Sequence, residues 1–357
     1  MSVRAISGYG DKEAACFLVE IAGRRFILDM GVEAGNTPNL DGVGPIDAVL
    51  ISHCHADHVG ALDLIGQLGN PPAYATAATA ALSKSQSKVA MLPLPLYGRA
   101  EIAGVAIETG RAAHTPGGVW LRLGGEDGVL YSADWSIEGP LYGFDAPPRA
   151  RHLILDASYG DYDEALADAI PSLLAFAAKG PALLPIPPAG RGLEAALMLH
   201  EAGYRVQLCA THRTVADLLL TTDDALLLDG AKPRLAAMVA AAGALDAQSA
   251  PEGMMMAAPA DASKGVAGEL ARRFAADGSA NILITGHAAT GSLARELLDK
   301  GRADFLRWNV HPRLRDIGWM IETVKPEAVL PAFAGEKKVE ALRAALPAVT
   351  FKGPLLG

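Results

Sequence analysis

Short apolar runs separated by turn residues dominate the first third of the chain, a pattern typical of β-strands. The runs Ala15–Ile21 and Arg25–Asp29 flank Ala22-Gly23-Arg24 and predict a hairpin. A buried strand is expected over Asp47–Ser52 and a helix over Val59–Leu68. Four further strands are predicted, over Val105–Thr109, Val119–Leu123, Gly128–Ser132 and His152–Asp156.

Beyond about Tyr159 the pattern changes, and strand-like runs alternate with alanine-rich helical stretches. Strands are predicted over Pro181–Ile186, Arg205–Cys209, Gly253–Ala257, Asn281–Thr285 and Ala328–Pro331. Helices are predicted over Ala165–Ala178, Gly192–Glu201, Val215–Leu220, Pro233–Ala242, Lys264–Ala276, Ser292–Lys300, Asp316–Thr323 and Lys338–Leu346. Alternation of this kind predicts an α/β protein in which helices cover a sheet, with a domain boundary near residue 158.

Composition narrows the class of protein. The 357 residues are half hydrophobic and suffice for two domains, and 40 acidic against 31 basic side chains give a net charge of −9. That charge argues against a protein that coats nucleic acid or an anionic membrane. Three cysteines are too few for a disulfide framework, and neither a leader nor a spanning segment is visible. We therefore expect a soluble, cytoplasmic protein with no membrane contact, and the sequence indicates no protein partner.

The segment from Ile51 to Gly60 carries the strongest chemical signal. His53, His55, Asp57 and His58 lie between a predicted strand and a predicted helix. In an extended chain the side chains of His53 and His55 point to the same side and can bind one ion, while Asp57 and His58 can turn toward a second. Imidazole and carboxylate groups suit zinc and its divalent neighbours. The alternative is a polar loop with several surface histidines.

Two more ligands are expected downstream. His114 precedes the strand predicted over Val119–Leu123, and Asp134 follows the strand predicted over Gly128–Ser132. A carboxylate such as that of Asp134 can bridge two ions, which lowers the pKa of a shared water.

With these ligands the sequence resembles the metallo-β-lactamase fold hydrolases, whose signature matches His53, His55, Asp57 and His58, then His114, then Asp134. Asp29 matches a structural aspartate on an early strand of that fold. The resemblance implies an αββα sandwich with the metals at one edge, and Zn²⁺ as the cofactor with Mn²⁺ as an alternative.

A second resemblance concerns the middle of the chain, which is similar to the β-CASP group of nucleases. The segments His152–Gly160, Leu184–Glu194 and Asn281–Ser292 resemble parts of the β-CASP cap, and His311 matches its motif B. The implied architecture is a metallo-β-lactamase fold domain over residues 1–157 and 285–357, with a β-CASP-like α/β cap inserted over residues 158–284.

The second resemblance also implies roles for single residues. Asp156, at motif A, would hold a ligand imidazole from outside the metal shell. His311 would protonate the leaving oxygen or contact the scissile phosphate, and would act with Asp57 and Asp134 in catalysis. A structural aspartate and a helix-flanking histidine are the alternatives for Asp156 and His311. Candidate phosphate contacts are Ser158, Arg191, Gly291 and Ser292, the last two with a plain helix N-cap as the alternative.

One position departs from the family pattern. Phe333 stands where RNA-cleaving members carry a last metal-binding histidine, so we expect one tight and one weaker metal site. The DNA-processing branch, the Artemis and crosslink-repair group, also lacks that histidine.

These resemblances predict a metal-dependent nuclease that hydrolyses phosphodiester bonds with metal-activated hydroxide and favours DNA over RNA. The alternatives are an RNA-processing nuclease of the same family, a small-molecule hydrolase of esters, lactones or nucleotides, and a catalytically silent binding protein. Exonuclease and endonuclease action are both open. A nucleic acid would lie in a confined basic groove, with Arg191, Arg307, Arg313, Arg315, Lys337 and Lys338 as candidate contributors.

Overall fold

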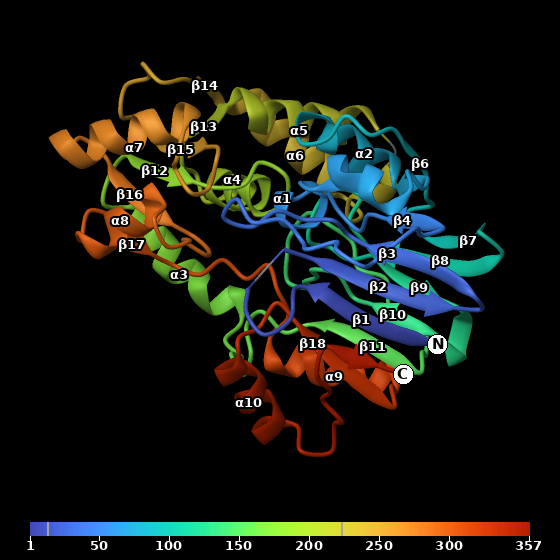
Figure 1. Cartoon of the computed structure of the whole chain (residues 1–357). Helices are drawn as coiled ribbons and strands as arrows, with labels where there is room; N and C mark the ends of the chain where they lie inside the picture. The colour runs from blue at the N-terminus through green and yellow to red at the C-terminus, as the bar shows by residue number, and fades with distance from the viewer. Residues whose placement is uncertain (13, 223) are drawn as a thin grey trace. The chain divides into compact units, whose positions relative to one another are not determined.

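The computed structural model describes residues 1–12, 14–222 and 224–357. The chain forms two compact units, labelled by their elements in Figure 1. The first, here called the sandwich unit, comprises Met1–Ile137, Gly143–Glu164 and Val310–Gly357. The second, here called the inserted unit, comprises Glu138–Tyr142 and Ala165–Asn309. The domain boundaries expected from the sequence, at 157/158 and 284/285, stay predictions; the main transitions between the compact units fall at 164/165 and 309/310.

The first sheet of the sandwich unit has seven strands in the order β19-β1-β2-β3-β4-β5-β6. These strands are β1 (Ser2–Ser7), β2 (Cys16–Ile21), β3 (Arg24–Leu28), β4 (Ala48–Leu50), β5 (Ala73–Ala75), β6 (Met91–Pro93) and β19 (Leu355–Leu356). The hairpin expected at residues 22–24 is confirmed. Ile21 pairs with Arg24 across Ala22 and Gly23, whose φ angles of 51° and 71° suit a two-residue turn.

The second sheet of the sandwich unit has six strands in the order β18-β11-β10-β9-β8-β7. They are β7 (Gly98–Ile102), β8 (Val105–Arg111), β9 (Val119–Leu123), β10 (Val129–Tyr131), β11 (His152–Asp156) and β18 (Ala328–Ala332). Strands β7 to β10 are antiparallel neighbours, whereas β10, β11 and β18 run parallel. The residues that follow β10, β11 and β18 therefore leave the sheet at one edge.

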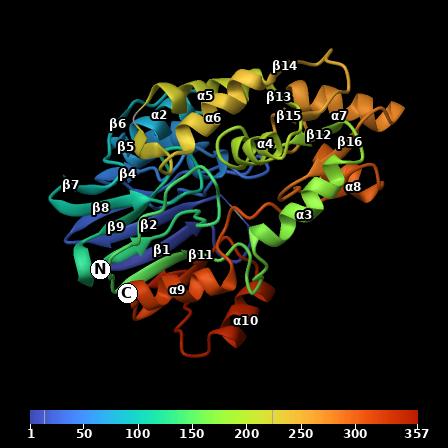
Figure 2. The same cartoon turned by 180° about the vertical axis from the view of Figure 1, so that it is seen from behind.

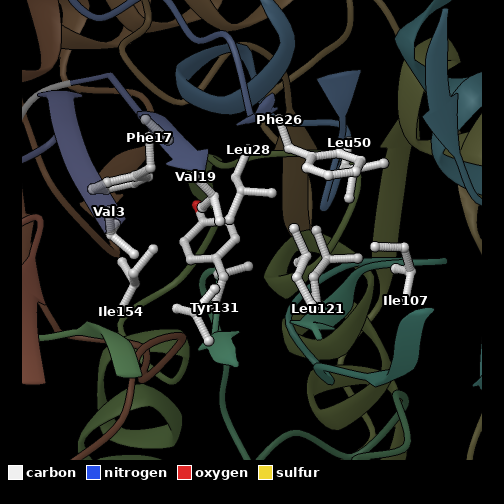
Figure 3. Packing of buried hydrophobic residues seen from close by; sticks show 14 of the residues in the cluster. Val3, Phe17, Val19, Phe26, Leu28, Leu50, Ile107, Leu121, Tyr131 and Ile154 are labelled. Carbon is white, nitrogen blue, oxygen red and sulfur yellow. The ribbon is translucent and has the colours of Figure 1, made fainter. Parts of the chain in front are cut away.

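The core of the sandwich unit lies between its two sheets. Phe17 and Leu28 of the first sheet point toward Leu121, Tyr131 and Ile154 of the second, as Figure 3 shows. All five side chains are fully buried. Burial of this kind stabilises the fold by roughly 1.5–3 kcal/mol for each large apolar side chain.

Helices cover the outer faces of both sheets. The first sheet packs against α1 (Ala56–Val59) and the 3₁₀ helix η1 (Leu62–Leu68). The second packs against α9 (Leu314–Val324) and α10 (Glu336–Ala345), and α9 lies beside β11 in both views (Figures 1 and 2). The short helix α2 (Ala77–Leu82) follows β5. This layering confirms the predicted αββα sandwich.

The inserted unit is built on a six-stranded parallel sheet in the order β14-β13-β15-β12-β16-β17. Its strands are β12 (Ala182–Pro185), β13 (Val206–Cys209), β14 (Gly243–Leu245), β15 (Met254–Ala257), β16 (Asn281–Ile284) and β17 (Asp304–Phe305). Its helices are α3 (Leu166–Ala177), α4 (Arg191–Glu201), α5 (Ala210–Thr221), α6 (Ala231–Ala241), α7 (Gly265–Asp277) and α8 (Leu293–Asp299).

The central strands of this sheet are buried on both faces. Leu183 and Met255 belong to the core that includes residues of α7, whereas their neighbours Leu184 and Met256 point to the opposite face and are also fully buried. Helix α7 contacts β12 and β16, and α4 contacts β13 and β15. Within the residues described, no helix is long and apolar enough to cross a membrane.

Candidate metal centre

The segment from His53 to His58 runs from the loop after β4 into α1 and is fixed by backbone hydrogen bonds. Ala15 N donates to Asp57 O at 2.7 Å, and Met30 N donates to His58 O at 2.8 Å. Gly31 lies so close beneath this loop that a Cβ atom there would be 1.8 Å from Asp57 O. A side chain at position 31 would therefore displace the loop that carries the predicted ligands.

The predicted ligands gather in one buried cluster. Ligand atoms of His53, His55 and His114 lie within 4.8 Å of one another, and so do those of His53, His58 and Asp134. A third group of this kind contains His114, Asp134 and His311. His53 is 1% exposed and Asp134 is 4% exposed, so water cannot solvate the lone pairs freely.

Asp29 anchors one side of the cluster. Its carboxylate accepts hydrogen bonds from Ser52 N, Ser52 Oγ and Tyr131 Oη, each at 2.7 Å, and lies 2.7 Å from His58 Nδ1. The carboxylate makes His58 Nδ1 a donor, and His58 Nε2 then faces Asp134 Oδ1 at 3.5 Å. Tyr131 is a contributor that the sequence did not single out.

Hydrogen bonds also set the tautomers of His53 and His114. The one proton of the Ser52 hydroxyl goes to Asp29, so His53 Nδ1, 3.0 Å from Ser52 Oγ, is a donor. His114 Nδ1 donates to Val310 O at 2.7 Å. Both rings therefore direct an Nε2 lone pair into the cluster, and His53 Nε2 is buried with no hydrogen-bond partner among the described residues. A divalent cation is the partner that such an atom lacks.

Electrostatics of the cluster follow from burial and from opposite charges. Burial, together with the neighbouring histidines, holds the pKa of His53 well below its ordinary value. Burial opposes the charges on Asp134 and His58 as well, but the attraction between them outweighs it. The pKa of Asp134 is therefore lowered and that of His58 is raised.

Asp57 and His55 lie at the more open side of the site. Asp57 is partly exposed, and its Oδ2 atom is 3.9 Å from His58 Nε2. His55 is half-buried, and its Nδ1 atom is 3.1 Å from His114 Nε2. Two nitrogens at this separation can share one ion as ligands.

Asp156 contacts His311 and none of the four predicted ligand imidazoles at hydrogen-bond distance. Its Oδ2 atom, at the buried end of β11, lies 2.8 Å from His311 Nδ1. His311 Nδ1 is also 3.7 Å from Asp134 Oδ2, and its ring meets the ring of Tyr159 edge-on with centroids 5.1 Å apart. The structure thus places both His311 and the carboxylate that orients it at the cluster.

Phe333 follows β18 and packs against the cluster. Its ring centroid is 5.4 Å from that of His58 and 6.0 Å from that of Phe17. The residue has a φ of 60°, and its backbone N–H donates to Gly8 O. An apolar ring therefore borders the cluster beside His58.

The predicted phosphate contacts fall in both units. Ser158 lies in the sandwich unit, is buried, and donates its backbone N–H to Asp156 Oδ1. Arg191 begins α4 in the inserted unit, where its guanidinium packs against Gly286. Gly291 has a φ of 81°, and the Ser292 side chain accepts from Arg295 N as the N-cap of α8. This hydrogen bond matches the plain N-cap alternative.

Several of the candidate basic residues are already paired. Arg313 makes a two-pronged ion pair with Asp316, and Arg315 makes one with Asp163. Lys338 donates to the backbone oxygen of Ser158. These three residues are less available to a phosphate than the sequence suggests.

Comparison with known proteins assigns the first half of the chain. Residues 9–185 match the family described as the metallo-beta-lactamase superfamily. These residues contain every expected ligand from His53 to Asp134, and the chain carries a domain of that superfamily.

Curated relatives share part of the sequence. The chain is 27% identical over 225 residues to the "Ribonuclease TTHA0252" of Thermus thermophilus, covering 53% of this chain and 52% of the relative. It is 24% identical over 252 residues to the "Transcription termination factor FttA" of Cenarchaeum symbiosum, covering 56% and 39%. A fragment of 83 residues is 39% identical to the "Probable cleavage and polyadenylation specificity factor subunit 2" of Drosophila melanogaster, covering 21% and 11%. The chain thus spans about half or less of the relatives it matches.

The fold also recurs among solved structures, and one example matches nearly the full length of the chain. It is a protein of unknown function from Enterococcus faecalis V583, with a TM-score of 0.62, 13% identity and 99% coverage of both chains. At that identity the likeness shows the fold alone.

Proposed function

We propose that the protein is a metal-dependent phosphodiesterase that cleaves RNA. One observation carries the proposal. His58 Nε2 and His114 Nε2 lie 3.5 and 3.6 Å from the Asp134 carboxylate, His53 joins them in the buried cluster, and His53 Nε2 has no hydrogen-bond partner among the described residues. Two relatives, a ribonuclease and a transcription termination factor, favour RNA. The DNA preference expected from the sequence has no such support.

We assign the ligands to two cation positions. His53, His55, His114 and Asp134 would hold the first ion, and His58, Asp57 and Asp134 would hold the second. Phe333 offers no ligand beside His58, so the second ion should bind more weakly. Zn²⁺ suits this donor set and Mn²⁺ is compatible with it. A bound cation of this kind polarises the phosphate and lowers the pKa of water to near neutrality.

His311 is proposed to transfer a proton to the leaving oxygen of the substrate. Asp156 accepts from Nδ1 and fixes the ring, which leaves Nε2 as the nitrogen that exchanges a proton. Burial of both side chains keeps this pair free of competing water. Asp156 therefore acts as a positioning residue, and His311 is the residue expected to touch the substrate.

The test is a cleavage panel on RNA and DNA oligonucleotides of one sequence, with the protein loaded with Zn²⁺ or Mn²⁺. RNA fragments should appear with the native protein and should be lost in His53→Ala. The matched control is His200→Ala, a histidine at the end of α4 in the inserted unit, which should retain full activity. Faster cleavage of DNA than of RNA would overturn the choice of RNA. Hydrolysis of small esters or lactones with both polymers intact would overturn the nuclease proposal.

A further inference from the structure

The inserted unit contains a cysteine in an unusual setting. Cys209 ends β13 and occupies the N-cap position of α5, a helix of 12 residues. The first backbone N–H groups of a helix have no intrahelical partner, and their dipoles favour negative charge at this end. A thiol placed here is biased toward its thiolate form.

A buried imidazole stands beside the thiol. Cys209 Sγ is 3.2 Å from His212 Nδ1 and 3.4 Å from Thr211 Oγ1. His212 is fully buried, and its Nε2 atom has no hydrogen-bond partner among the described residues. A Cβ atom at Gly192 would lie 2.6 Å from that Nε2, so the ring is held tightly against α4. The pair is therefore fixed in position by the fold of this unit.

The thiol lies directly beneath the protein surface. Cys209 itself is only 1% exposed, but the next two residues, Ala210 and Thr211, are both exposed. Cys209 thus packs in the core of this unit with Leu245 and Met255, while the exposed first turn of α5 follows it directly. A small molecule can reach it through local fraying of that turn.

The three cysteines of the chain differ sharply in acidity. Burial opposes ionisation of Cys209, but hydrogen bonds and charge from His212, with a further hydrogen bond from Thr211, lower its pKa to about 6. Burial raises the pKa of Cys54 to about 12, and raises that of Cys16 as well, with Asp29 adding to the effect. All three are free thiols, so Cys16 and Cys54 serve as internal controls.

We propose that Cys209 is a modification site for hydroperoxides, with His212 as its proton partner. His212 takes the thiol proton on Nδ1, and the thiolate attacks one oxygen of the peroxide. The S–O bond forms as the O–O bond breaks, and the leaving hydroxide or alkoxide takes the proton from His212 to form water or an alcohol. Sulfur loses two electrons, the peroxide gains two, and the product is a sulfenic acid at the start of α5. This site is independent of the metal cluster and of the proposed nuclease activity.

The first experiment exposes the native protein to hydrogen peroxide with dimedone, which traps sulfenic acids, and maps the label by peptide mass spectrometry. Label should appear on Cys209 and be absent from Cys16 and Cys54. Equal labelling of all three cysteines, or no label on Cys209, overturns the proposal. In urea the three thiols should react with iodoacetamide alike, which ties any difference between them to the fold.

The second experiment measures the pH profile of alkylation by iodoacetamide. In the native protein the rate at Cys209 should be half-maximal below pH 7, whereas an ordinary thiol reaches this point near pH 8.5. In His212→Gln the rate at pH 6.5 should fall roughly fivefold, because the loss of thiolate is partly offset by its higher nucleophilicity. If that variant does not fold, as judged by circular dichroism, the native profile alone decides. A native profile centred near pH 8.5, or an unchanged profile in folded His212→Gln, overturns the proposal.

Discussion

Two buried carboxylates, one in each unit, respond to burial in opposite ways. Asp134 in the sandwich unit faces His58 at 3.5 Å, and attraction to His58 and His311 holds its pKa well below the ordinary value despite its burial. Glu194 in the inserted unit has the Trp308 indole at 3.4 Å and a backbone N–H as partners, and burial raises its pKa to about 7. Burial thus fails to raise the pKa of Asp134, which lies among histidines, but does raise the pKa of Glu194, whose partners are an indole and a backbone N–H.

The different surroundings of Asp134 and Glu194 indicate different roles for the two carboxylates. A dense set of imidazoles around a carboxylate concentrates lone pairs and negative charge, which favours a divalent cation. A single carboxylate under a close-packed backbone is a structural group: a Cβ atom on Gly139 would lie 2.0 Å from Glu194 Oε1. Removing charge should therefore damage binding in the sandwich unit and improve stability in the inserted unit.

The largest expected effect comes from breaking the cluster. His114→Ala removes one of four ligands of the first ion, and a four-ligand zinc site is worth about 10–16 kcal/mol. A quarter of that energy, about 2.5–4 kcal/mol, corresponds to a loss of metal affinity of about 10²- to 10³-fold. Calorimetric or chelator-competition titration measures the change. Cys209→Ser is the control with unchanged affinity, and metal affinity within a few fold of native in His114→Ala would contradict the ligand assignment.

Variants of His311 should show whether this residue transfers a proton or binds the metal. In His311→Ala, cleavage of RNA should fall on the order of 10²-fold because the leaving oxygen loses its acid. Hydrolysis of a nitrophenyl phosphodiester, whose leaving group needs no proton, should fall far less. Asp156→Asn should show the same selectivity in weaker form, since it acts through His311. Equal losses on both substrates would instead give His311 a part in binding the metal or the phosphate.

Much of the cluster could be predicted from the sequence because its residues occur in short motifs at the ends of strands. The segment from His53 to His58 combines three imidazoles and a carboxylate in six positions after β4, and His114 and Asp134 follow β8 and β10 in the same way. The partners of these side chains could not be predicted in the same way. Asp29 and Tyr131 are 102 positions apart, and only the packing of two sheets brings them to 2.7 Å.

The limits on predicting the fold have a similar physical origin. The central strands β9, β11 and β12 are wholly buried and stand out as apolar runs. The edge strand β7 is mostly exposed, and β1 has one fully buried residue, so neither shows a strong pattern. In place of the helix expected over Val59–Leu68, the short helix α1 ends at Val59 and the 3₁₀ helix η1 covers Leu62–Leu68. The pair of Cys209 and His212 shows only as a spacing of three at the start of a helix, which many helices share.

Phe333→His would add a ligand to the cluster, whereas His114→Ala removes one. The new imidazole would stand beside His58, and histidine tolerates the φ of 60° at this position better than most residues. The second ion should bind about 10²- to 10³-fold more tightly, which is the same energy per ligand as in His114→Ala. A titration should then show two tight ions, where one is expected for the native protein. Phe333→Leu is the matched control, and two tight ions in the native protein would contradict the role assigned to Phe333.

Neutralising the isolated carboxylate should have a smaller and opposite effect. The folded-state pKa of Glu194 is raised from 4.5 to about 7, so between these values the folded protein binds a proton that the unfolded chain has lost. Stability contributed by the protonated form is complete below pH 4.5 and is lost as the pH rises through 7. The shift corresponds to about 3 kcal/mol, and the extra buried N–H₂ of glutamine returns part of it, so Glu194→Gln should gain about 2 kcal/mol at pH 8. Urea unfolding at pH 5 and pH 8 measures the difference in stability between the native protein and the variant, which should be near zero at pH 5.

Glu201→Gln, at the exposed end of the same helix, is the control and should change stability little at either pH, because an exposed ion pair contributes about 0–1 kcal/mol. A pH-independent difference between Glu194→Gln and the native protein would mean that Glu194 is compensated after all, as Asp134 is.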